Sequence, residues 1–142
     1  MFSKEESKKV RQDFWIFFGK RHPRKWLLYN TGIKDVVLKF NFDKKKAMVS
    51  IDITSNDPVF QTYYYDKLES LKNLLLEEVS SELVFDSSFT LDSGKSIGRV
   101  YLKKDDVSIH NKHSWPEVFD FFYTYMDKME GFFIEYKDFI SS

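Results

Sequence analysis

The chain of 142 residues carries 22 basic and 22 acidic side chains, so no global charge directs it toward nucleic acid or an anionic membrane. It contains no cysteine, which excludes disulfides, thiolate metal sites and cysteine nucleophiles. Aromatic residues make up 18% of the chain, and 15 of them are phenylalanines, more than a disordered tail carries. The composition therefore predicts a folded chain with a bulky core.

The length predicts one domain over residues 1–142. The N-terminal stretch MFSKEESKKVRQ is charged where a signal peptide needs an apolar segment. No apolar run approaches the roughly 20 residues of a membrane-spanning helix. We therefore expect a cytoplasmic protein that does not act at a membrane.

The first predicted elements are a helix and a short strand. Ser3 and Glu6 have the spacing of a capping box, and apolar residues recur at helical spacing from Val10 until Pro23 ends the pattern. The apolar run KWLLYN is bounded by turn residues, which favours a first strand over 26–30.

The stretch GIKDVVLKFNFDKKKAMVSIDIT predicts a hairpin of two alternating strands that turns at DKKK. Pairing Phe42 with Ala47 places every apolar residue of both strands on one face. In this register Asp35 lies opposite Thr54, and Asp52 is its diagonal neighbour. We expect both carboxylates on a solvated face.

The remaining chain predicts a helix capped by Asp57 and Pro58, a second hairpin over 82–104 with an edge strand at DVSIH, and a long helix that begins at a capping box from Ser114 to Glu117. The expected fold is α+β, in the order α-βββ-α-ββ-α. It has a mostly antiparallel sheet of about five strands, with helices packed on the sheet.

The acidic pair Asp35 and Asp52 is the first candidate site. Two carboxylates at diagonal positions have the ligand chemistry that Mg²⁺ needs, and acids before and within successive strands are similar to the PD-(D/E)xK nuclease core. Thr54 stands where that motif has its lysine, so the resemblance is to a degenerate member. We therefore expect a solvated sheet face with no catalytic residue and no metal. Mg²⁺ would be a cofactor only if the nuclease alternative held.

Two basic clusters are candidates for contact with phosphates. One lies in the predicted hairpin turn, and the other lies in GKRHPRK, beside Trp26 as a stacking residue. The alternative is that both are ordinary solvated loops. The candidate residues are Lys44, Lys45, Lys46, Arg21, Arg24 and Lys25.

Two further patterns favour ordinary structure over chemistry. His110 and His113 lack a third zinc ligand nearby, which favours a loop. Of Tyr63, Tyr64 and Tyr65, at least one must leave the buried face of its helix, which hints at a partner surface.

The stretches RQDFW, TGIKDVVLKF, SIDIT and GRVYLKKDDVSIHNKHSWPEVFDFF resemble the small stand-alone proteins, best known from Bacteroidetes, of the bacterial family domain of unknown function 4268. The resemblance covers nearly the whole chain. It implies a bacterial cytosolic protein, and larger members that look like partners of restriction-type nuclease modules imply a link to DNA by analogy.

No complete catalytic constellation is visible in the sequence. We therefore expect a non-enzymatic module that binds a protein partner or a second copy of itself through surplus aromatic surface. The alternative is a nucleic-acid-binding module related to a degenerate nuclease.

Overall fold

The computed structural model describes residues 2–142. Its elements are α1 (Lys4–Arg21), β1 (Val36–Phe42), β2 (Lys46–Ile53), α2 (Pro58–Ser70), α3 (Lys72–Glu78), β3 (Val84–Thr90), β4 (Ser96–Asp105), a 3₁₀ turn η1 (Lys112–Ser114) and α4 (Trp115–Ser141). The strands form one antiparallel sheet in the order β1-β2-β4-β3. The α+β prediction is confirmed at this level.

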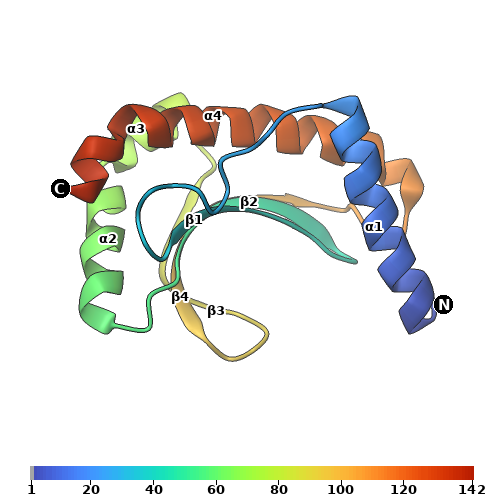
Figure 1. The fold of residues 1–142 in the computed structure, drawn as a ribbon, viewed down its shortest axis with the longest axis horizontal. Helices are drawn as coiled ribbons and strands as arrows, with labels where there is room; N and C mark the ends of the chain where they lie inside the picture. Colours follow the sequence, from blue (N-terminus) through green and yellow to red (C-terminus); the bar gives the residue numbers. More distant parts are fainter. Residues whose placement is uncertain (1) are drawn as a thin grey trace.

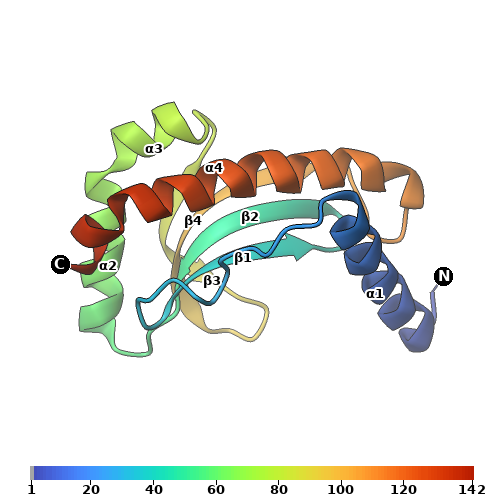
Figure 2. The same cartoon turned by 45° about the horizontal axis from the view of Figure 1, so that its top comes forward.

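The curved sheet lies beneath α4, which runs across it from end to end (Figure 1). In both views α1 stands at one end of the sheet and α2 at the other (Figure 2). Phe122 of α4 packs on Phe40 and Phe42 of β1, so the face of the sheet toward α4 is the core face. Among residues 2–142, no helix is both long enough and apolar enough to cross a membrane.

Local sequence signals account for several element ends. Both hydrogen bonds of the predicted capping box form at Ser3 and Glu6, with lengths of 3.1 and 3.2 Å. Asp57 accepts a hydrogen bond from the backbone N–H of Val59 at 2.9 Å, and Pro58 opens α2 as predicted.

The predicted register of the first hairpin is confirmed. Phe42 lies opposite Ala47, and the pairing continues without a slip to Val36 and Ile53. The second hairpin also forms, with an irregularity between Asp86 and Phe89 of β3.

Two predicted strands are wrong. Residues 26–30 form no strand: Leu28 has φ 45°, and the N–H of Asn30 bonds back to the carbonyl of Leu27 in a turn. Residues 106–110 are also irregular, because the 108–114 segment is folded on itself by hydrogen bonds of the Ser114 hydroxyl. That hydroxyl therefore makes no capping bond, and the predicted capping box at Ser114 is wrong.

The predicted solvated face of the first hairpin is also wrong in part. Every β2 residue from Ala47 to Ile53 is buried, on both faces of the strand. The reason is the strand's place in the sheet: β2 is central, and Phe89 from β3 lies over the face that the hairpin alone would leave to water. We call this second face of the sheet the concave face.

Candidate functional site

Asp52 lies on the concave face and is engaged by Arg99 of β4. Its two carboxylate oxygens accept hydrogen bonds from Nε and Nη2 of Arg99, both at 2.8 Å, and both side chains are buried. The guanidinium also lies 4.3 Å from the ring centroid of Phe89. Asp52 is thus a buried structural carboxylate, contrary to the expected solvated position.

Asp35 lies just before β1, in a turn with φ 62°. Its backbone carbonyl accepts hydrogen bonds from the N–H and hydroxyl of Thr54, at 2.8 and 3.3 Å, as the register predicted. Because both oxygens of Asp52 are occupied by Arg99, the two aspartates do not form an open carboxylate pair. Within residues 2–142, no cluster of three or more His, Asp or Glu side chains could hold a metal.

The resemblance in topology to the nuclease core is not supported either. Within residues 2–57, two strands and not three precede α2, and every strand pairing of the described residues is antiparallel. The segment read as the first of three strands is the turn-containing stretch around Leu28. The strand order around the two aspartates therefore differs from the α-βββ-α order expected for the nuclease core.

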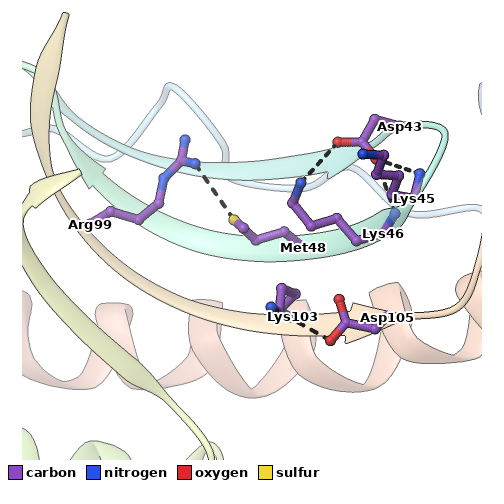
Figure 3. A network of polar contacts seen from close by, with 7 residues as sticks. All are labelled: Asp43, Lys45, Lys46, Met48, Arg99, Lys103 and Asp105. Atoms are coloured by element: carbon purple, nitrogen blue, oxygen red, sulfur yellow. Dashed lines mark hydrogen bonds and ion pairs between the residues drawn. The ribbon is translucent and has the colours of Figure 1, made fainter. Parts of the chain in front are cut away.

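Half of the basic candidates have acidic partners. Arg21 lies 3.8 Å from Asp120, and Lys46 lies 3.3 Å from Asp43 in the β1–β2 turn (Figure 3). Arg24 contacts Asp127 at 2.6 Å and Glu130 at 2.9 Å. Within the described chain, the candidates without an ion-pair partner are the exposed lysines Lys25, Lys44 and Lys45.

The other two patterns behave as ordinary structure. His110 exchanges a hydrogen bond of 3.2 Å with the Ser7 hydroxyl and stacks near Phe2. Of the three tyrosines, Tyr65 is buried and Tyr63 is exposed, so the expected exit of one tyrosine from the buried face is confirmed.

The segment between α1 and β1, residues 22–35, is held to α4 by the carboxylates of Asp127 and Glu130; we call it the strap. The buried Glu130 accepts hydrogen bonds from the Arg24 guanidinium at 2.9 Å and from the backbone N–H of Leu27 at 2.6 Å. The Arg24 guanidinium in turn lies 4.0 Å from the ring centroid of Trp26. Glu130 therefore supports the Trp26 ring through Arg24, while the ring itself packs on Phe40 and Tyr123.

An apolar cavity of about 360 Å³ opens between α1, the strap and β1; we call it the aromatic pocket. Rings from three elements form its walls, including Trp15 of α1, Trp26 of the strap and Phe40 of β1. The buried Nε2 of His22 finds no hydrogen-bond partner among residues 2–142. The lining residues are Trp15, Phe18, Gly19, His22, Arg24, Trp26, Leu28, Tyr29, Leu38, Lys39 and Phe40.

The aromatic pocket adjoins a free sheet edge, because among residues 2–142 the only strand that pairs with β1 is β2. The bonds from Thr54 N–H to Asp35 O and from Asp43 N–H to Lys46 O fix which β1 residues bond to β2. By strand alternation, the backbone groups of Leu38, Phe40 and Phe42 point away from β2.

The strap uses only part of this edge, where the N–H of Leu38 bonds to the carbonyl of Leu28 at 3.1 Å. The backbone N–H and C=O of Phe40 have no partner among residues 2–142. A short length of strand edge is therefore open beside an apolar cavity.

The sequence interpretation missed this site. Trp26 and Arg24 were assigned to stacking and phosphate contact, and the Trp26 segment to a strand. The carboxylate that organises both residues lies more than a hundred positions away. The available local signal was the pairing of Trp15 with Gly19, one helical turn apart, because it leaves a large ring beside an empty position.

The chain matches no curated protein and no solved structure. A family model matches residues 10–137, a range that includes most of α1, the strap, the whole sheet and most of α4. The chain belongs to the family described as Domain of unknown function (DUF4268).

Proposed function

We propose that this domain binds a short extended segment of another protein along the outer edge of β1, with an apolar side chain of that segment in the aromatic pocket. In this mode, backbone hydrogen bonds give affinity and side-chain pockets give specificity. The observation that carries the proposal is the unpaired backbone of Phe40 directly beside a cavity of about 360 Å³.

The chemistry of the pocket favours an aromatic or large aliphatic side chain. Its walls are rings, and its volume lies in the range of pockets that hold small organic groups. Burying such a side chain there contributes roughly 1.5–3 kcal/mol, and the backbone bonds supply direction. Edge strands that carry unpaired N–H and C=O groups are natural templates for an added strand.

The chain offers a clean way to block the pocket. Gly19 lines it, and a Cβ at this position would have no neighbouring atom within 4 Å. Gly19→Leu therefore adds bulk at the pocket wall, and its Cβ meets no neighbouring atom. Because leucine has a higher helix propensity than glycine, the variant is expected to keep or raise stability. Gly131→Leu on α4 is the matched control, since that position is also exposed and open.

The test starts from linear peptides selected from a displayed library on the immobilised full chain. Calorimetry then compares the enriched peptide on the wild type, Gly19→Leu and Gly131→Leu. We expect Gly19→Leu to weaken binding at least about 10-fold and Gly131→Leu to change it less than about 2-fold. Equal affinity of all three proteins, or no enriched peptide, would contradict the proposal.

The bound segment could also come from a second copy of this chain. Sedimentation of the full chain at rising concentration tests that alternative. We expect a monomer. A dimer that Gly19→Leu abolishes would assign the edge to a second copy and contradict the proposal of a different protein as partner.

A further inference from the structure

A second cavity, of about 170 Å³, lies on the concave face directly across β1 from the aromatic pocket; we call it the concave cavity. Lys39 lines both cavities, so the two meet at the edge strand. The lining residues of the concave cavity are Lys39, Asn41, Asp43, Lys46, Met48, Phe89, Thr90, Leu91, Asp92 and Arg99.

Two hydrogen-bond donors of β1 in this cavity lack partners. The Nδ2 of Asn41 is buried and makes no hydrogen bond within residues 2–142. Lys39 has no carboxylate within ion-pair distance in the same part of the chain. A buried donor without an acceptor destabilises the protein, so an arriving acceptor would recover that free energy.

The other charges of the cavity are mostly matched. Asp43 accepts hydrogen bonds from two backbone N–H groups and from Lys46 Nζ (Figure 3). Arg99 directs Nε and Nη2 to Asp52 and Nη1 to the sulfur of Met48. The exposed Asp92 enters from the β3–β4 turn. The donors nearest to the open edge are therefore Lys39 and Asn41, both on β1.

Strand geometry links the two cavities. Successive side chains of a strand point to opposite faces, so a segment added to β1 directs one side chain to the core face and the next to the concave face. Resting on the proposed function, we infer that the bound segment carries an aspartate or glutamate directly beside its apolar residue. Its carboxylate would accept from Lys39 Nζ and Asn41 Nδ2.

The first readout is the sequence of the selected peptides. Each selected peptide should contain one apolar residue whose contribution to binding is lost in Gly19→Leu. We expect an acidic residue to be enriched directly beside that apolar residue. Enriched peptides that depend on the pocket but have no acid at either neighbouring position would overturn this inference and leave the proposed function intact. Peptides insensitive to Gly19→Leu would instead overturn the proposed function.

The second readout is a double-mutant cycle between protein and peptide. Lys39→Met keeps the aliphatic stem and removes the charge, and the peptide partner carries glutamine or asparagine in place of the acid. We expect each single change to weaken binding about 5- to 20-fold, and the two together to cost little more than one. Lys44→Met, in the exposed β1–β2 turn, is the matched control and should be silent. Additive losses, or equal losses from Lys44→Met, would overturn the assignment of Lys39.

Discussion

Arg99 of β4 and Asp52 of β2 lie opposite each other on neighbouring strands and form a bidentate ion pair, with both nitrogen–oxygen distances at 2.8 Å. Both side chains are almost fully buried, at 5% and 2% exposure for Arg99 and Asp52. Removing one partner of such a pair leaves an uncompensated buried charge, which is the costly outcome in a low-dielectric interior.

Asp52→Asn is therefore expected to lower the free energy of unfolding by about 3–5 kcal/mol, because the Arg99 charge stays buried while its partner becomes neutral. Denaturation by urea measures the effect. Asp35→Asn is the matched control: the same chemical change is made in a half-buried turn with positive φ, which asparagine tolerates. We expect the control to stay within about 0.5 kcal/mol of the wild type. Equal, small effects of both substitutions would contradict the buried-pair account.

The hydrogen bonds of Glu130 are expected to order the backbone of the strap. Glu130→Ala removes the acceptor of Leu27 N–H and one partner of Arg24, so stability should fall by about 2–3 kcal/mol and amide exchange should rise over residues 24–30. Asp127→Ala removes only an exposed partner of Arg24 and should cost less than about 1 kcal/mol. Unchanged exchange over the strap in Glu130→Ala would show that the other contacts of the strap, including Arg24 with Asp127 and Leu38 N–H with Leu28 O, are enough to order it.

Tyr65 gives the fold a dependence on alkaline pH. Burial, assisted by a hydrogen bond with the Glu69 carboxylate, raises the pKa of the Tyr65 phenol to about 12. An unfolded tyrosine ionises near pH 10, so the unfolded chain releases this proton first as the pH rises. The contribution to stability is complete below about pH 10 and is lost as the pH rises toward about 12.

Urea denaturation at a series of pH values from about 9 to 11.5 tests this dependence. The wild type should lose on the order of 1–2 kcal/mol more over this range than Tyr65→Phe, which keeps the ring and removes the ionising group. The other tyrosines, including Tyr136 with its raised pKa, are present in both proteins and cancel in the comparison. Parallel stability curves would show that Tyr65 ionises alike in the folded and unfolded chains.

The hairpin register was predictable because period-two alternation leaves one pairing that collects all apolar side chains on one face. The solvent exposure of Asp52 was not predictable in the same way. Its burial depends on β4 and on Phe89, which come from a distant hairpin, and the pattern of one strand contains no information about its second neighbour.

The strap shows the same limit at the candidate site. KWLLYN has the composition of a strand, but Leu28 adopts φ 45° and the segment is organised by Glu130, in the middle of α4. The tertiary hydrogen bond from Leu27 N–H to Glu130 therefore outweighs the strand propensity of the local sequence. The aromatic pocket lies between this irregular segment and β1. The pocket was therefore not predictable as long as residues 26–30 were predicted to form a strand.

Amide hydrogen exchange of the full chain, with and without the selected peptide, tests the central claim most directly. An added strand on the β1 edge should protect the N–H groups of Phe40 and Phe42. The N–H groups of Lys39 and Asn41, which already face β2, should change little. Protection that alternates in this way is the predicted result. Binding that leaves Phe40 and Phe42 unprotected, or protects all β1 amides alike, would contradict strand addition at this edge.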